Sequence, residues 1–429
     1  MKEPLYIVSG VRTPFARMGT TLAGCDAVEL GRTATAALLA QTAIDPGLID
    51  EVVFGCVGNP VDAANVGRVI ALRAGVPEHV PAITVSRNCA SGFEAVTQAA
   101  DKAAAGRGEI FLVGGAESMS NYPLVYNDRA VKKFGALAKA KTIGQKLGAL
   151  AQFRPTDLFA PRVALMLGLT DPVCGLGMGQ TAELLARDWQ LSREAQDEFA
   201  MHSHHKAEAA REKMQEEITP VYPRNGREAS AVTADNGVRE GQTMAALGKL
   251  KAVFDRNGGT VTAGNASQIT DGAVALLVMT EAGLKKTNST PLGRLTGFAY
   301  AGCEPARMGL GPVYAIARAE KETGLTLADA DLIEINEAFA AQVMACRAAA
   351  TSQDYARHHL GRDTALGEIP LDRLNVNGGA IALGHPVGAT GARLVLTTLK
   401  ELHRRGGKRA LVSLCIGGGQ GGALWLETV

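Results

Sequence analysis

The chain has 429 residues, and its 44 Lys and Arg residues nearly balance its 43 Asp and Glu residues, giving a formal net charge of +1. This balance argues against a basic nucleic-acid-binding protein and an acidic tail, while 46% apolar and 20% charged residues exclude a disordered chain. The 50 glycines exceed the usual ~7% share. Because they follow no collagen-like period, they predict many tight turns and close backbone approaches.

No segment of the sequence has the pattern of a targeting or membrane signal. The apolar run within residues 1–10 is too short for a signal peptide, and no stretch approaches the ~20 apolar residues of a membrane span. The seven cysteines are scattered and include no CxxC pair, which argues against a disulfide framework or a zinc module and for a reducing compartment. We therefore expect a cytoplasmic protein that holds no metal ion.

The two ends of the chain predict the same succession of elements. Pro4-Leu5 leads to an Ala-Arg-Met-Gly sequence at 16–19, and Pro291-Leu292 leads to the same four residues at 306–309. Each copy continues with an Ala-rich helix and then a short strand after an acidic residue. These segments are 27–43 and 50–54 in the first half, and 313–323 and 331–335 in the second.

A second unit also recurs. In the first half, a strand at 83–85 leads into Asn88–Gly92, a helix to Ala105 and a strand at 110–113. In the second half, a strand at 374–376 leads into a Gly-rich turn, followed by a helix over about 391–404 and a strand at 410–414. Such strand–helix–strand units have right-handed connections and parallel strands. Two copies predict a pseudo-twofold pair of α/β domains.

The segment between the copies, 122–267, differs in character. It contains a polar helix over 192–217 and a hairpin-like run over 222–241. Residues 129–154 contain seven Lys or Arg residues and no acidic residue, with apolar residues at near-helical spacing, so they predict a basic amphipathic helix or helix pair. We expect 122–267 to be a domain inserted into a two-domain platform. The expected halves are 1–121 with 268–290, and 291–429.

Cys89 lies at a predicted strand-to-helix turn. A thiol at a helix N-terminus experiences the positive end of the helix dipole, which lowers its pKa and favours a nucleophile. The alternative is that Cys89 is simply a small buried apolar residue, as many free cysteines are.

Two further sites make a nucleophile the better interpretation. His385 lies in a Gly-rich run at 377–391, which leaves little side-chain bulk to bury it, whereas the other seven histidines suit a solvated surface or a helix face. It can act as a base beside a thiol. Cys415 ends a buried strand before Gly417–Gly419, whose N–H groups can form an oxyanion hole, although a close-packed strand end explains the glycines equally well. Asn336–Phe339 ends another strand, where parallel sheets place ligand-facing side chains.

Five short blocks follow one another along the chain: Asn88–Gly92, Gly264–Ser267, Asn336–Phe339, Gly384–Pro386 with Gly388 and Gly391, and Cys415–Gly419. With these blocks in this order, the sequence resembles the thiolases over nearly its whole length. Related decarboxylating condensing enzymes typically carry a Cys-His-His or Cys-His-Asn set and lack the Cys415 block. The resemblance implies an α/β fold of two pseudo-symmetric βαβαβαββ halves in a layered α/β/α/β/α arrangement, with an inserted loop domain.

The resemblance also implies an activity, the reversible cleavage of 3-ketoacyl-CoA by coenzyme A in a ping-pong cycle. Cys89 is then the acyl-accepting nucleophile, His385 takes its proton, and Cys415 exchanges a proton with the acetyl-CoA enolate. Coenzyme A is a co-substrate, and no cofactor is bound permanently. The alternatives are a catalytically silent lipid or CoA carrier, against which the retention of all three residues speaks, and a Claisen-type synthase with another acyl donor.

Two oxyanion holes follow from the resemblance. Asn336, through a water molecule, and His385 form one, and the N–H groups of Cys89 and Gly417 form the other. The residues that match the lining of the pantetheine channel are Ser267, Met178, Ala338 and Phe339. Gly177 stands where many members of the family have His, so one CoA contact differs.

The number of residues between Cys89 and Met178 is closer to that in the thiolase subunit of fatty-acid β-oxidation complexes than to that in short biosynthetic thiolases. Three explanations of the basic segment 129–154 remain open: a solvated face, attraction for CoA phosphates, and docking to a partner subunit or a membrane surface. We hypothesise that docking or control of substrate length explains the added residues. The resemblance further implies a homodimer or homotetramer, and it is compatible with a hydratase/dehydrogenase partner subunit.

Overall fold

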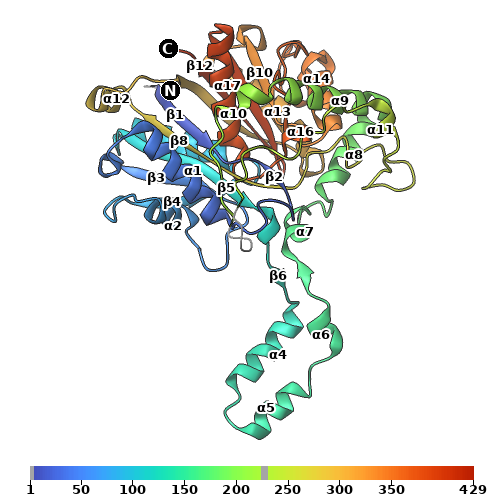
Figure 1. Cartoon of the computed structure of the whole chain (residues 1–429). Helices are drawn as coiled ribbons and strands as arrows, with labels where there is room; N and C mark the ends of the chain where they lie inside the picture. Colours follow the sequence, from blue (N-terminus) through green and yellow to red (C-terminus); the bar gives the residue numbers. More distant parts are fainter. Residues whose placement is uncertain (1–3, 224–229) are drawn as a thin grey trace.

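In the computed structural model, which describes residues 4–223 and 230–429, a body of sheet and helices carries a long projecting arm (Figure 1). The arm consists of residues 124–163 and extends well away from the body. The elements with candidate functional residues at their ends all belong to the body.

Within the described residues, ten strands form one mixed sheet, in the order β10-β11-β12-β9-β1-β8-β5-β3-β4, with the short β2 paired to β8. Their bounds are β1 Leu5–Arg12, β2 Ala16–Arg17, β3 Glu51–Gly55, β4 Ala82–Val85, β5 Ile110–Ser118, β8 Thr270–Met279, β9 Gly293–Gly302, β10 Leu332–Ile335, β11 Arg409–Ile416 and β12 Gln420–Glu427.

The strand order confirms the internal repeat. The first half runs β1-β8-β5-β3-β4 and the second runs β9-β12-β11-β10, with β3 parallel to β4 and β5, and β10 parallel to β11. The remaining pairs are antiparallel, and β1 joins β9 over only three residue pairs, from Leu5 to Ile7. The sheet is therefore two similar halves that meet edge to edge.

The prediction of a strand at 374–376 is wrong, because only an isolated parallel bridge joins Leu374 to Ile333. Asn375 has a positive φ of 46°, and its side chain occupies the hydrogen-bonding groups of Ile335: its Oδ1 accepts from the backbone N–H and its Nδ2 donates to the carbonyl, both at 2.9 Å. The backbone still bonds to Ile333 through Arg373 and Asn375, and at Ile335 the Asn375 side-chain amide takes the place of further backbone hydrogen bonds.

Helices form three layers around the two sheet halves. The central layer is α3 (Ser91–Ala104) and α17 (Thr390–Arg405), which share one apolar core with β1, β5, β8, β11 and β12. Helices α1 (Ala27–Thr42) and α2 (Val66–Arg73) cover the outer face of the first half, and α13 (Gly311–Thr323) and α14 (Ala340–Thr351) cover the second. This is the expected α/β/α/β/α layering, with the starts of α3 and α17 at its centre.

The remaining helices connect these layers. They are α7 Ala164–Gly168, α8 Met178–Asp188, α9 Arg193–Ala209, α10 Arg211–Gln215, α11 Met244–Gly248, α12 Glu281–Thr287, α15 Gln353–His359 and α16 Ala380–Leu383, with 3-10 turns η1 Pro46–Leu48, η2 Met119–Asn121, η3 Pro305–Leu310 and η4 Leu327–Asp329. The polar helix predicted over 192–217 is interrupted at Ala210. The hairpin-like run predicted over 222–241 lies partly outside the described residues; an isolated bridge joins Val221 to Val232.

The arm is a ribbon of β6 (Leu124–Val125) and β7 (Arg162–Val163) that carries α4 (Asp128–Lys139), α5 (Ile143–Leu150) and α6 (Pro155–Phe159). The buried carboxylate of Asp157 pairs with Arg129 at 2.7 Å and Lys133 at 2.6 Å, which ties α6 to α4. Several apolar side chains stay exposed: Val131, Ile143, Leu147, Leu150 and Phe159. In the described parts of the chain, no helix combines the length and apolar character needed to cross a bilayer.

Candidate active site

Cys89 lies in the turn between β4 and α3, two residues before the helix begins. Asn88 enters this turn with a positive φ of 45°, a conformation that Asn tolerates better than most residues. Its Nδ2 donates to the carbonyl of Gly417 at 2.7 Å. The Asn88 side chain therefore joins the Cys89 turn to the loop after β11.

A cavity of about 230 Å³ opens above Cys89. Asn88, Gly417 and Gly418 line its floor beside Cys89. Its walls are mostly apolar: Val57, Met119, Tyr122, Leu165, Leu169, Val173, Met178 and Val387. Most of these walls come from the residues just before β6 and just after β7, so the root of the arm encloses the cavity.

The electrostatic environment of Cys89 differs from the sequence-based expectation. Burial raises the pKa of the Cys89 thiol, while the backbone N–H groups of Gly417 and of Cys89 itself lower it to a smaller extent. The expected lowering of the pKa at the helix N-terminus is thus wrong, because loss of water outweighs the local donors. In the resting protein Cys89 is a thiol, and it needs a base to become a nucleophile.

Cys415 lies next to last in β11 and is only 1% exposed. Burial raises its pKa well above the ordinary value, and the proximity of Cys89 raises it further. The two predicted cysteines thus lie close enough to influence each other's ionisation, and both are protonated at neutral pH.

His385 is buried, with 6% of its surface exposed. We expected the flanking glycines to leave the His385 side chain unburied, and this expectation is wrong. Its Nδ1 lies 2.6 Å from Thr390 Oγ1, and its Nε2 lies 3.4 Å from Asn336 Nδ2. Burial, and then the positive charge of Arg393, lower the pKa of His385 to about 3. The imidazole is therefore neutral and able to accept a proton.

Asn336 follows β10 directly and is 1% exposed. While its Nδ2 faces His385, its buried Oδ1 has no hydrogen-bond partner among the described residues. A buried amide oxygen without a partner is costly, and an ordered water molecule commonly satisfies such an atom. The unpartnered Oδ1 is thus the atom that would bind the water molecule implied at Asn336 by the resemblance to thiolases.

The starts of α3 and α17 pack with their backbones in contact, which brings the Cys89 turn beside the His385 turn. A Cβ atom on Gly92 would lie 2.5 Å from the backbone N of Ala392, and one on Gly391 would lie 2.3 Å from the backbone N of Phe93. Only glycine fits at both positions. Part of the glycine excess therefore serves this contact.

The residues predicted to line the pantetheine channel also lie together. The Ser267 N–H donates to the Ala338 carbonyl at 2.9 Å. Met178, Ala338 and Phe339 share one apolar cluster with Cys415. That cluster also includes Phe254, whose ring meets the ring of Phe339 edge to face at 6.1 Å. Sequence reasoning missed Phe254, an aromatic residue among charged and turn residues.

Gly177 has a structural role at the start of helix α8. It caps the start of α8, and its N–H donates to Gln180 Oε1 at 2.8 Å. The absence of a side chain at this position leaves Met178, the next residue, on the wall of the cavity.

Glu117 is a second residue that the sequence analysis missed. It lies near the end of the fully buried strand β5, and its carboxylate accepts from the backbone N–H groups of Val57, Gly58 and Gly388 at 2.8–3.1 Å, and from the Tyr122 hydroxyl at 3.0 Å. Burial raises the pKa of Glu117, against the lowering by these donors. The sequence signal that could have identified Glu117 is a single acidic residue within an otherwise apolar strand.

One histidine assignment also needs correction. His204 is one of the seven histidines expected on a solvated surface or a helix face, but it is buried, and its Nδ1 accepts from the backbone N–H of Arg239 at 3.1 Å. Burial lowers its pKa to about 4. His204 lies on the buried side of α9 and contributes to the packing of this helix.

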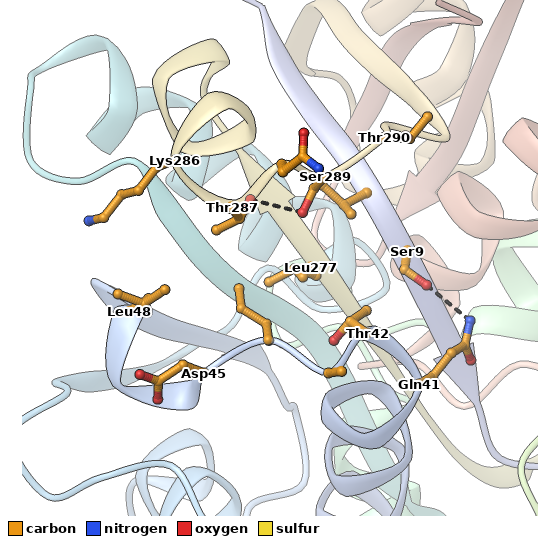
Figure 2. A pocket seen from close by; sticks show the side chains of 14 residues that line it. Ser9, Gln41, Thr42, Asp45, Leu48, Leu277, Lys286, Thr287, Ser289 and Thr290 are labelled. Atoms are coloured by element: carbon orange, nitrogen blue, oxygen red, sulfur yellow. Dashed lines mark hydrogen bonds between the residues drawn. The ribbon is translucent and has the colours of Figure 1, made fainter.

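A larger hollow of about 560 Å³ lies elsewhere, where the ends of α1 and α12 meet β1. Figure 2 shows its polar lining, with Gln41 bonded to Ser9 and Thr287 bonded to Ser289. None of the predicted site residues lines it. Within 4–223 and 230–429, no group of three or more His, Cys, Asp or Glu side chains is arranged to hold a metal ion. Of the predicted site residues, Cys89, Met178 and Gly417 line the smaller cavity instead.

Comparisons with known proteins agree on one family. The family models described as "Thiolase, N-terminal domain" and "Thiolase, C-terminal domain" match residues 5–282 and 289–428. The chain is 43% identical to a 3-ketoacyl-CoA thiolase of Pectobacterium carotovorum and 41% identical to one of Aeromonas salmonicida, in each case over 99% of this chain and 97% of the relative.

Solved structures give the same result. A Bacillus anthracis acetyl-CoA acetyltransferase matches with a TM-score of 0.86 and 33% identity, covering 100% of this chain and 99% of that one. Human mitochondrial 3-ketoacyl-CoA thiolase in complex with CoA matches with a TM-score of 0.84 and 36% identity, covering 100% and 98%.

Proposed function

Because the chain belongs to the thiolase family, we propose that it transfers acyl groups through a covalent intermediate on Cys89. It is a CoA-dependent acyltransferase that cleaves a 3-ketoacyl-CoA into an acyl-CoA and acetyl-CoA, and the reaction is reversible. The observation that carries the assignment of Cys89 is its position in the lining of a mostly apolar cavity, beside Asn88, Gly417 and Gly418.

The first step forms the acyl-enzyme. Nε2 of His385 takes the proton of the Cys89 thiol, and the sulfur attacks C3 of the 3-ketoacyl-CoA. The C2–C3 bond then breaks, and the acyl group stays on Cys89 as a thioester. The neutral state of His385 suits this task, because a base must hold a free lone pair.

The second proton belongs to Cys415. When the C2–C3 bond breaks, its electron pair leaves with the acetyl-CoA fragment, and the Cys415 thiol protonates C2 to give acetyl-CoA. The high pKa of the buried Cys415 supports this role, because a thiol that holds its proton at neutral pH matches the strongly basic carbanion.

The third step restores the enzyme. The thiolate of Cys415 takes the thiol proton of coenzyme A, and the CoA sulfur attacks the acyl group on Cys89. The Cys89 sulfur leaves and recovers its proton from His385. Protons and electron pairs balance over the cycle without a metal ion or redox partner.

Two oxyanion sites complete the proposal. The N–H groups of Cys89 and Gly417 stabilise the oxygen of the acyl group being transferred, and His385 with a water molecule on Asn336 stabilises the enolate oxygen. The contact between Asn336 and His385 at 3.4 Å supports the second assignment. Met178, Ser267, Ala338 and Phe339 line the path of the pantetheine arm.

The organisation of the chain follows from the same proposal. Segment 122–267 is an inserted domain that supplies Met178 and Ser267 to the substrate path. The halves formed by 1–121 with 268–290 and by 291–429 supply Cys89 on one side and His385 with Cys415 on the other. The protein forms a homodimer or homotetramer, and its seven unbridged cysteines support a cytoplasmic location.

The arm is proposed as a docking element for a partner subunit such as a hydratase/dehydrogenase. It projects away from the body (Figure 1), and none of its residues 124–163 lines the cavity above Cys89, so the CoA phosphates are not its natural target. Its exposed apolar side chains lie among basic residues, which suits a partner face with apolar and acidic groups.

Thiolysis of acetoacetyl-CoA tests the activity directly. We expect cleavage that depends on added coenzyme A and is lost in Cys89→Ala and in Cys415→Ala, while Cys303→Ala, which alters a cysteine outside the cavity, retains the wild-type rate. Binding of acetoacetyl-CoA without cleavage would instead identify a carrier, and condensation only with a different acyl donor would identify a Claisen-type synthase.

A further inference from the structure

Both ring nitrogens of His385 have polar neighbours of known hydrogen-bonding character. On one side Thr390 Oγ1 lies 2.6 Å from Nδ1, and on the other Asn336 Nδ2 lies 3.4 Å from Nε2. All three side chains are buried. Bulk water therefore cannot exchange freely for either partner, and the two neighbours decide which nitrogen carries the proton.

The Thr390 hydroxyl has only one hydrogen to give. Thr390 Oγ1 lies 3.1 Å from the carbonyl of Pro386, and a carbonyl can only accept. A hydroxyl hydrogen directed at that carbonyl leaves the Thr390 oxygen to accept from His385, which requires a hydrogen on Nδ1. The 3.4 Å approach of Asn336 Nδ2 to Nε2 agrees with the same tautomer, because an amide nitrogen can only donate.

The backbone holds this arrangement in place. The Pro386 carbonyl also accepts the N–H groups of Ala389 at 2.9 Å and of Thr390 at 3.0 Å, so the turn that precedes α17 is tied to one point. The His385 N–H donates to the Gln268 carbonyl at 3.1 Å. The imidazole and the Thr390 hydroxyl are therefore fixed relative to each other by the same tight turn.

We propose that Thr390 is a positioning residue whose hydroxyl keeps the proton of His385 on Nδ1, so that Nε2 presents its lone pair to the Cys89 thiol. The inference rests on the proposed role of His385 as the base for Cys89. In the opposite tautomer Nε2 would carry a hydrogen and could not take the thiol proton, so the acyl-enzyme would not form.

The surrounding charges favour the neutral ring that this arrangement needs. Arg393, one turn further along α17, is buried and lies 3.5 Å from the Glu334 carboxylate on β10. Its positive charge opposes protonation of His385. Thr390 thus chooses the position of a single proton, while Arg393 discourages a second one.

The first experiment compares Thr390→Val, which keeps the shape but removes the hydroxyl, with Thr390→Ser, which keeps the hydroxyl. We expect kcat for acetoacetyl-CoA thiolysis to fall by about 100-fold in Thr390→Val, in the range that a positioned base supplies, with KM within about 3-fold of the wild type. Thr390→Ser should restore kcat to within about 3-fold. Equal losses in both variants, or a wild-type kcat in Thr390→Val, would overturn the role of Thr390.

A spectroscopic measurement on the unaltered protein does not depend on how the Thr390 variants fold. A long-range ¹H–¹⁵N correlation spectrum distinguishes Nδ1–H from Nε2–H in each histidine, and the ring that disappears in His385→Ala identifies His385. We expect the Nδ1–H form; the Nε2–H form would overturn the inference. A wild-type thiolysis rate in His385→Ala would instead refute the proposed base itself, so the two failures are distinguishable.

Discussion

Gly92 and Gly391 lie backbone against backbone at the centre of the molecule. A Cβ atom on Gly92 would lie 3.1 Å from the Gly391 N, and one on Gly391 would lie 2.9 Å from the Gly92 carbonyl carbon. This contact lets α3 and α17 begin side by side, one just after Cys89 and the other just after His385. The catalytic pair of the proposed mechanism therefore depends on two residues without side chains.

Gly391→Ala should damage both stability and activity, because the added methyl group meets backbone that cannot move aside. We expect a loss of about 1–3 kcal/mol in the free energy of unfolding, typical of overpacking in a close-packed core, measured by urea denaturation. Gly135→Ala is the matched control, since a Cβ there meets nothing within 4 Å on the helix α4 of the arm. Equal stability of the two variants would contradict this role for the glycine contact.

The pH dependence of Cys89 reactivity should lack a step from His385. Burial lowers the pKa of His385 to about 3, so lowering the pH from about 8 to about 5, across the ordinary pKa of ~6.5, leaves the base unprotonated. Above neutrality the rate of alkylation by iodoacetamide should keep rising toward the raised pKa of Cys89. An inflection near the ordinary histidine pKa that disappears in His385→Asn would contradict this prediction.

Tyr122 should limit the length of the acyl chain. Its ring forms part of the wall of the cavity above Cys89, and its hydroxyl donates to the buried Glu117, which fixes the ring. Tyr122→Ala should raise kcat/KM for long 3-ketoacyl-CoA relative to acetoacetyl-CoA by about 10-fold or more, the effect of one or more methylenes in an apolar pocket.

Tyr122→Phe is the control for that experiment, because it keeps the ring and loses only the hydroxyl. We expect its chain-length profile to follow the wild type. If both variants leave the profile unchanged across a ladder of 3-ketoacyl-CoA lengths, Tyr122 does not set the length.

The arm should be dispensable for chemistry but required for association. Replacing the exposed Ile143 and Leu147 by Ser removes apolar surface without opening the core, so thiolysis of acetoacetyl-CoA should stay within about 2-fold of the wild type. Analytical ultracentrifugation with a co-expressed hydratase/dehydrogenase subunit should show weaker association. Unchanged association would refute docking through this face, and binding to anionic vesicles instead would assign the arm to a lipid surface.

Much of the arrangement was predictable because its signals are local. Strand ends followed by short motifs gave Cys89, Asn336 and Cys415, and the repeated Ala-Arg-Met-Gly words gave the two halves. The segment 374–376 does not continue as a strand because the Asn375 side chain occupies the backbone N–H and carbonyl of Ile335. A prediction from secondary-structure propensity does not take account of a side chain that occupies backbone hydrogen-bonding groups.

What the sequence did not reveal depends on contacts between distant segments. Burial of His385, and the resulting low pKa, arise from elements packed around a Gly-rich turn that itself has little bulk. Glu117 bonds to residues about 60 and 270 positions away in the chain. Thr390 is inconspicuous in sequence, and only the distances to His385 and Pro386 give its hydroxyl a role.

The central claim is that the acyl group resides on Cys89, and peptide mapping tests it most directly. The protein is incubated with acetyl-CoA, digested and analysed by mass spectrometry. We predict one acetyl group on the peptide that contains Cys89 in the wild type, and none in Cys89→Ala. An acetyl group that persists in Cys89→Ala, or that is found on Cys415 instead, would contradict the mechanism.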